Sequence, residues 1–194
     1  MPRLKGSQTA TNLMISFAGE SQANMRYTYY EKVARYEGYE QIGDIFAETA
    51  KNERAHAERF YKLLREELAS ETVEISNAFP VNYSKTPSNL AAAFEGEEEE
   101  SEKLYPSFAK TAEEEGFPII AEVFRNIAQA EKAHKERFFK LYENFRNNRV
   151  FKRDEDVLWK CGNCGYIFEG KEPPITCPAC LVEQSYFELF VENY

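Results

Sequence analysis

Residues 38–63 read GYEQIGDIFAETAKNERAHAERFYKL, and the stretch returns in altered form 78 residues later, at 116–141, as GFPIIAEVFRNIAQAEKAHKERFFKL. The aligned pairs include an aromatic residue, an acid and a histidine: Phe46 with Phe124, Glu53 with Glu131, and His56 with His134. Such a repeat indicates that one helical hairpin has been duplicated. We therefore expect a fold with pseudo-twofold symmetry.

Helical periodicity extends outward from this repeat through most of residues 1–148. It predicts four helices, near 9–36, 39–68, 88–114 and 117–147. The segment between the second and third helices has no helical pattern, and its roughly 19 residues are enough to cross the length of a bundle. Two tight turns and one long crossover predict an all-α four-helix bundle of the ferritin-like arrangement.

Composition narrows the functional classes. The formal net charge is −9, without a basic cluster, which argues against nucleic acid and anionic membranes as partners. The N-terminal stretch MPRLKGSQTATNL lacks an apolar signal core, and no apolar stretch is long enough to span a bilayer. We expect a cytoplasmic protein with a bundle at 1–148, a linker at 149–157 and a small C-terminal domain at 158–194.

Acids and histidines interrupt the apolar stripes of the expected helices. Steps of three and four residues keep side chains on one face, and in the second helix that face reads Ile42, Phe46, Thr49, Glu53, His56, Phe60, Leu63. The fourth helix reads Ile120, Phe124, Ile127, Glu131, His134, Phe138, Leu141, and the first reads Leu13, Phe17, Glu20, Asn24, Tyr27. Burying several carboxylates costs many kcal/mol unless cations compensate them.

The third helix carries the run EEEE at 97–100. Its stripe, read as a regular helix, is Leu90, Phe94, Glu97, Ser101, Leu104, Phe108, which places Glu97 inside and Glu99 toward solvent. Glu98 and Glu100 flank the stripe at similar angles, so geometry alone does not choose between them.

One Glu-x-x-His pair alone is most often an exposed helix turn. Here two pairs share one repeat position and use the only two histidines of the chain. With Glu20 and Glu97 they complete the pattern of di-iron or di-manganese bundles, and we predict a dinuclear metal site. Tyr27 and its repeat counterpart Tyr105 are candidate hydrogen-bond donors to ligand carboxylates, with ordinary aromatic packing as the alternative.

All four cysteines lie in the last 34 residues, as two C-x2-C pairs separated by 12 residues: Cys161, Cys164, Cys177 and Cys180. This spacing predicts a tetrathiolate metal site. A unit this small needs the metal for stability. Spacing alone allows structural zinc or a one-electron iron centre.

A carboxylate–histidine bundle followed by CGNCGY…CPAC resembles the rubrerythrin family over nearly the whole chain. The resemblance implies a rubredoxin-type iron at the four cysteines, with zinc as the substitute, and a non-haem di-iron site at Glu20, Glu53, His56, Glu97, Glu100, Glu131 and His134. The family's extra carboxylate corresponds to Glu100, whose first-half counterpart is Ala23, and Glu98 is the alternative ligand. Family members exchange His56 and Glu100 as ligands to one iron with oxidation state.

The resemblance also implies an activity, which is reduction of hydrogen peroxide to water in protection against oxidative stress. Electrons come ultimately from NAD(P)H through a rubredoxin or rubredoxin reductase, and a head-to-tail homodimer shortens their path. Ferroxidase or iron handling is the main alternative, since it uses the same bundle and ligands. An oxygen-activating oxidase and a non-enzymatic module with structural metals are further alternatives.

Overall fold

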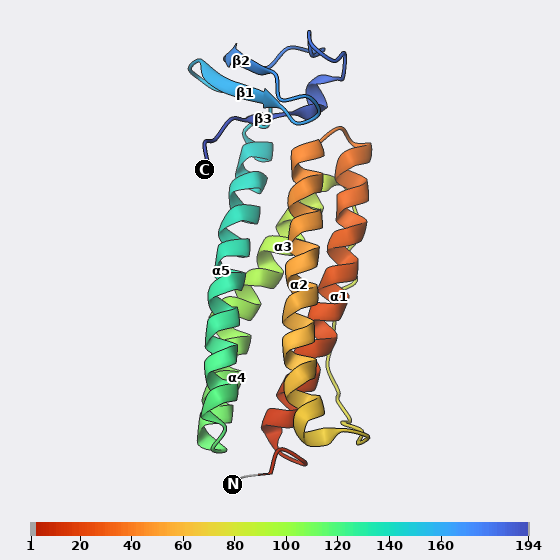
Figure 1. Cartoon of the computed structure of the whole chain (residues 1–194), viewed down its shortest axis with the longest axis vertical. Coiled ribbons are helices and arrows are strands. Elements are labelled where there is room, and N and C mark those ends of the chain that lie inside the picture. The colour runs from red at the N-terminus through yellow and green to blue at the C-terminus, as the bar shows by residue number, and fades with distance from the viewer. Residues whose placement is uncertain (1–2, 194) are drawn as a thin grey trace.

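The computed structural model describes residues 3–193 and contains a helical bundle with a small domain at one end (Figure 1). Helix α1 (Gln8–Tyr36) and helix α2 (Glu40–Leu68) form the first hairpin. After the long connection, α3 (Thr86–Glu99), η1 (Glu100–Leu104) and α4 (Tyr105–Glu114) make up the third rod, and α5 (Pro118–Arg146) the fourth. The expected ferritin-like four-helix bundle is confirmed, with boundaries within two residues of the expected ones.

Local chemistry explains where these helices begin and end. The hydroxyl of Ser7 accepts a hydrogen bond from the backbone N–H of Ala10, which caps α1. Gly38 and Gly116 adopt positive φ angles of 82° and 84° in the two tight turns, a conformation that costs glycine nothing. Pro118 stands in the first turn of α5, where no backbone donor is needed.

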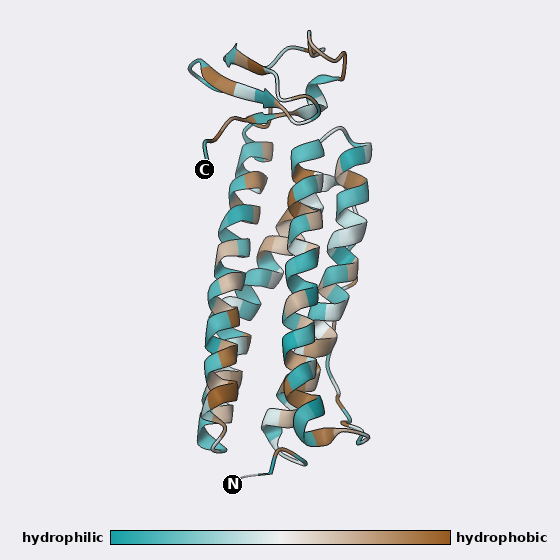
Figure 2. Ribbon diagram, in the orientation of Figure 1, coloured by the Kyte–Doolittle hydropathy of each residue, from teal (hydrophilic) through white to brown (hydrophobic). Residues whose placement is uncertain are grey.

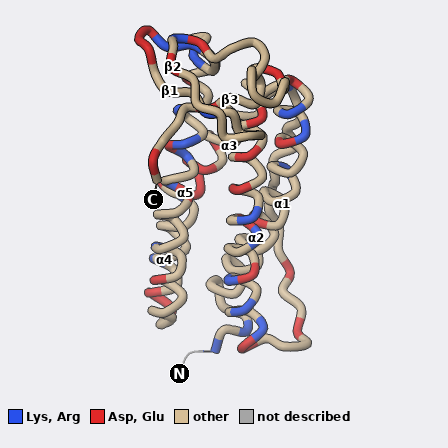
Figure 3. The backbone as a smooth tube through the Cα atoms, turned by 45° about the horizontal axis from the view of Figure 1, so that its top comes forward, with Lys and Arg blue, Asp and Glu red and all other residues tan. Residues whose placement is uncertain are grey.

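Two apolar clusters fill the bundle, above and below a polar middle layer. The cluster toward the N-terminal end of α1 centres on Leu13, Phe60 and Phe124. The cluster toward the small domain centres on Tyr30, Phe46 and Phe138. Figure 2 shows hydrophilic residues on the outward faces of the helices, and Figure 3 shows acidic and basic residues interspersed along them. The acids of the predicted site lie between the two clusters.

The third rod corrects the sequence prediction, which assumed one regular helix over 88–114. Ser101, Leu104 and Phe108 were expected in the core but are only half-buried, whereas Tyr105, Ala109 and Ala112 are buried. The cause is the π-helical turn η1, in which the N–H of Tyr105 donates to the carbonyl of Glu100, five residues back. One extra residue in a helical turn rotates everything after it by about 100°.

The repeat contains this extra residue. Glu20 and Tyr27 are seven residues apart in α1, whereas their counterparts Glu97 and Tyr105 are eight apart. The π turn absorbs the additional residue and keeps both the acid and the tyrosine buried. The change of repeat offset in the sequence was therefore the signal for η1.

The C-terminal domain is a three-stranded antiparallel sheet in the order β2-β1-β3, formed by β1 (Val157–Cys161), β2 (Ile167–Gly170) and β3 (Phe187–Leu189), with a short helix η2 (Gln184–Tyr186). Trp159 and Phe187 are its buried aromatics. The domain lies over the end of the bundle, close to the turn between α1 and α2 (Figure 1). Within residues 3–193, no helix combines the length and apolar character that crossing a membrane requires.

Candidate metal centres

Four carboxylates lie at the centre of the bundle, one from each rod. Glu20, Glu53, Glu97 and Glu131 are at most 1% exposed. Each occupies a core-facing position of its helix, between the two apolar clusters. The sequence predicted all four positions because the stripe phase is set locally, within a few turns of each helix.

These acids and the two histidines form two groups that could each hold a cation. One contains Glu20, Glu53, His56 and Glu131, and the other contains Glu53, Glu97, Glu131 and His134. Within each group the ligand atoms lie within 4.8 Å of one another. Glu53 and Glu131 belong to both groups, so their carboxylates are placed to bridge two cations.

The imidazole nitrogens face the carboxylates in matching ways. Nδ1 of His56 lies 2.8 Å from Glu131 Oε1 and 3.0 Å from Glu53 Oε2. Nδ1 of His134 lies 2.9 Å from Glu131 Oε2 and 3.2 Å from Glu53 Oε1. The duplicated hairpin thus yields two similar metal positions related by pseudo-twofold symmetry.

Unpartnered buried atoms test whether cations fit this site. In the part of the chain that the structure describes, eight buried side-chain atoms lack a hydrogen-bond partner, and six of them belong to Glu20, Glu53, Glu97, Glu131 and His134. Buried polar atoms are rarely left unpaired. Oxygen and imidazole ligands suit iron and manganese, so the donor set and the orphaned atoms both fit two such cations.

The pKa values show how the site behaves when protons replace cations. Burial, and then the charge of Glu53, raise the pKa of Glu97 to about 8. Burial alone lowers the pKa of His56 and of His134, but the neighbouring carboxylates outweigh it and raise the two values to about 9 and about 12. The site is therefore strongly anionic unless it takes up positive charge.

Two buried tyrosines contact these carboxylates. The hydroxyl of Tyr27 donates to Glu97 Oε1 over 2.5 Å, and that of Tyr105 donates to Glu20 Oε1. Each tyrosine reaches the acid of the opposite half of the repeat. The rings also pack on aromatic neighbours, Tyr27 on Phe138 and Tyr105 on Phe60.

The glutamate run divides between solvent and interior. Glu99 is exposed and pairs with Lys103, and Glu98 lies at the surface within 4.0 Å of Lys135. Glu100 is only partly exposed, and its Oε1 lies about 4.0 Å from the point where a side chain on Gly19 would begin. Among the described residues it lies outside both ligand groups, and it lines a cavity of about 290 Å³ together with Gly19 and Tyr105.

Sequence reasoning missed Asn52, which precedes Glu53 on α2. Its amide nitrogen lies 3.2 Å from Nε2 of His134. The repeat counterpart of Asn52 is Ala130, next to Glu131. This break in the repeat was visible in the sequence, but nothing there placed Asn52 against the histidine of another helix.

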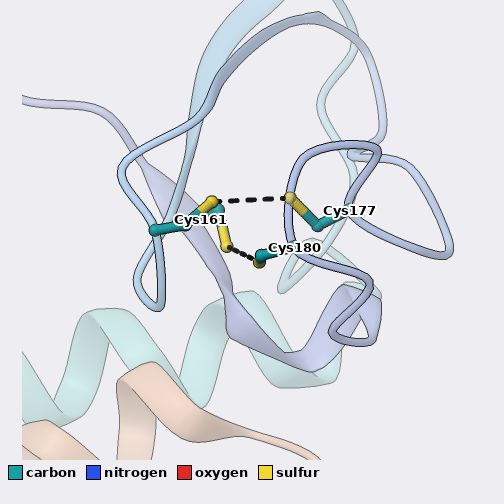
Figure 4. A group of neighbouring side chains, drawn as sticks. Cys161, Cys177 and Cys180 are labelled. Carbon is teal, nitrogen blue, oxygen red and sulfur yellow. Dashed lines mark hydrogen bonds between the residues drawn. The ribbon is translucent and has the colours of Figure 1, made fainter.

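Figure 4 shows Cys161, at the end of β1, facing Cys177 and Cys180 within the small domain. The sulfur atoms of Cys161 and Cys180 are 3.8 Å apart, and those of Cys164 and Cys177 are 3.7 Å apart. All four lie within 4.8 Å of one another. A hydrogen bond from Asn163 lowers the pKa of Cys180 to about 6, which favours the thiolate that binds metal.

Comparison with known proteins agrees with both centres. The family described as Rubrerythrin matches residues 11–142 and 88–158, and the rubredoxin-like domain of rubrerythrin matches residues 159–188. The chain belongs to the rubrerythrin family. It is 58% identical to the rubrerythrin of Clostridium perfringens over 195 residues, covering both proteins completely.

Solved structures agree with the fold of this rubrerythrin-family chain. Partially reduced nigerythrin is 34% identical, with a TM-score of 0.65, over 95% of this chain and 87% of that one. The bacterioferritin of Desulfovibrio desulfuricans shares the fold at 21% identity, with a TM-score of 0.66, over 73% of this chain and 82% of that one. Rubrerythrins bind iron, and this chain has the carboxylate and histidine residues of a di-iron site and a rubredoxin-like group of four cysteines.

Proposed function

We propose that this protein is a peroxidase that reduces hydrogen peroxide to two molecules of water, with two electrons and two protons supplied. Glu20, Glu53, His56, Glu97, Glu131 and His134 would hold two iron ions, which would supply the two electrons needed to reduce the O–O bond. The cysteines Cys161, Cys164, Cys177 and Cys180 would hold a third iron, which would supply electrons one at a time. The observation that carries the proposal is the presence of both centres in one chain, since iron storage needs no attached one-electron carrier.

The cavity beside Gly19 is the expected route for peroxide. It reaches Glu100 and Tyr105, and Tyr105 contacts the ligand candidate Glu20. A Cβ atom at position 19 would lie 3.8 Å from Phe79 and 4.0 Å from Glu100, so this position faces the cavity wall. Peroxide is small enough for such a cavity, whereas the organic substrate of a hydroxylase needs a larger apolar pocket.

Glu100 is the candidate for the exchangeable ligand. It lies at the cavity wall beside α1, close to Gly19, the residue that precedes Glu20. Burial, and then the charges of Glu97 and Glu131, raise its pKa well above the usual range. Away from the metals, Glu100 therefore takes up a proton more readily than an exposed glutamate does. A ferric pair is harder and more highly charged than a ferrous pair, so it favours the anionic oxygen over the imidazole of His56.

The electron path favours a partner subunit. From His134 to the end of α5 is 12 residues, or roughly 18 Å of helix, and the C-terminal domain lies beyond that end (Figure 1). A head-to-tail homodimer would bring the cysteine centre of one subunit beside the bundle of the other. We propose a rubredoxin or rubredoxin reductase as the external donor, fed by NAD(P)H in the cytoplasm.

Stopped-flow mixing of the iron-loaded, anaerobically reduced protein with one equivalent of peroxide tests the proposal. The cysteine-bound iron should oxidise after the bundle reacts. In Cys161→Ser the bundle should react once and then stop cycling with the donor. Continued cycling in Cys161→Ser would contradict the relay. Oxidation of many ferrous ions per subunit into mineral would favour ferroxidase instead.

A further inference from the structure

The two metal positions differ in one contact outside the ligand set. His134 has the side chain of Asn52 3.2 Å from its Nε2, the ring nitrogen that faces away from the carboxylates. His56 has Ala130 at the matching place in the repeat, and a methyl group cannot hydrogen-bond. The His134 side chain is 8% exposed and that of His56 is 16% exposed. Within residues 3–193, His134 thus has polar contacts at both ring nitrogens, whereas those of His56 are at Nδ1 alone.

The chemistry of imidazole decides which atom is the donor in this hydrogen bond. When Nδ1 binds a cation, Nε2 carries the ring proton and needs an acceptor. The Asn52 amide supplies one, because a half-turn of its terminal group puts Oδ1 in place of Nδ2. A hydrogen bond on the far nitrogen fixes the ring orientation and strengthens the ligand.

A second asymmetry lies on the opposite side of the site. Glu100 and the cavity adjoin Gly19 and Glu20. Glu20 belongs to the metal position of His56, the histidine that has Ala130 where His134 has Asn52. At the other position, the repeat counterpart of Glu100 is Ala23. The cavity also reaches Gly96, the residue before Glu97, so it adjoins both metal positions, but the spare acid has no counterpart in the first half of the repeat.

We infer that Asn52 is a positioning residue that anchors His134 and makes the Glu97/His134 position the tighter of the two metal positions. The Glu20/His56 position is then the one that releases its metal first. The inference rests on the metal ligands proposed above, but it is independent of the peroxidase reaction.

The test measures metal release from the full-length, iron-loaded ferrous protein into an excess of a ferrous chelator, without oxygen. The cysteine iron is followed separately by its thiolate absorption. Wild-type bundle iron should leave in a fast and a slow phase. In Asn52→Ala the slow phase should accelerate roughly 10- to 100-fold, the usual effect of losing such a contact, while the fast phase stays within about twofold. Asn52→Asp, which keeps an acceptor, should restore slow release.

Asn126→Ala is the matched control, because Asn126 is an exposed residue of α5. Anomalous diffraction from crystals stopped after the fast phase should find the remaining iron at the Glu97/His134 position. Iron remaining at the Glu20/His56 position would overturn the inference, as would equal acceleration of both phases or an unchanged slow phase in Asn52→Ala. A wild-type bundle that binds fewer than two irons would instead contradict the proposed metal centre.

Discussion

Tyr27 and Tyr105 each neutralise part of a buried carboxylate by donating a hydrogen bond. Because burial raises the pKa of both phenols well above the ordinary value, they remain protonated donors at physiological pH. A neutral donor orients its acid without adding charge. We therefore expect the tyrosines to raise metal affinity by fixing the direction in which Glu97 and Glu20 point.

Replacing Tyr105 with phenylalanine should weaken metal binding at the position that contains Glu20. The ring still packs on Phe60, but Glu20 loses its donor, and we expect metal affinity there to fall about 10-fold. Titration with Co(II), followed by its absorption spectrum, measures this loss. Tyr36→Phe is the control, since Tyr36 is 93% exposed. Equal affinities in the two variants would show that Tyr105 serves only packing.

Substituting Glu100 with alanine separates metal binding from reactivity. Because Glu100 lies outside both ligand groups, Glu100→Ala should retain two irons in the bundle while the rate of reaction with peroxide changes at least severalfold. Metal analysis and stopped-flow absorption measure the two properties. Glu98→Ala tests the alternative extra ligand and should react like wild type. If Glu98→Ala alone alters the rate, the assignment of Glu100 is wrong.

At the scale of elements, the third rod shows how one inserted residue serves a site. The π turn η1 places Glu100 at the wall of the cavity while Glu97 and Tyr105 stay buried. In α1, a regular helix with one residue fewer also keeps its acid and tyrosine buried, and it has Ala23 where the third rod has Glu100. Single-turn π segments inside α-helices are frequent at functional sites.

Deleting Glu102, an exposed residue of η1, should convert the third rod into a regular helix with the spacing of α1. We expect unchanged helical circular dichroism and two bound irons, but peroxide kinetics like those of Glu100→Ala. Adding Glu100→Ala to the deletion should have no further effect, because the two changes remove the same feature. Deleting Lys51 from the regular helix α2 is the contrast, since it turns Glu53 and His56 away and should abolish metal binding.

At the scale of the whole molecule, the buried acids couple folding to charge. The folded-state pKa of Glu97 is about 8, and that of His56 about 9, both above the usual values for these side chains. The metal-free folded protein therefore holds more protons than the unfolded chain over this range, and its stability falls as pH rises. Glu53, whose pKa is lowered despite its burial because of His134 and His56, acts in the opposite direction.

The metal-free bundle should therefore unfold at a lower temperature at pH 8 than at pH 6. Bound cations replace those protons, so the iron- or zinc-loaded protein should lose much less stability over the same interval, or gain it. Thermal unfolding followed at 222 nm, with and without metal, makes the comparison. A metal-free protein that is more stable at pH 8 would mean that the acids are not held in a desolvated core.

The sequence by itself determined the four rods, the crossover, the buried Glu20, Glu53, Glu97 and Glu131, and the cysteine pairs. These depend on local periodicity and spacing, which a repeat shows twice. The sequence predictions differ from the structure where a residue's neighbours belong to another helix. A regular helix, with 100° of rotation per residue, predicts the wrong face for Tyr105 and does not distinguish Glu98 from Glu100, because the π-helical turn η1 alters the rotation per residue.

Only the tertiary structure decided that Glu53 and Glu131 stand between both metal positions, that each tyrosine serves the opposite half of the repeat, and that Asn52 reaches His134. The physical reason is that a helix sets the direction of its own side chains within a few turns. The distance between two helices is set by the packing of all the side chains between them. Contacts across the bundle therefore exist only once the whole chain has folded.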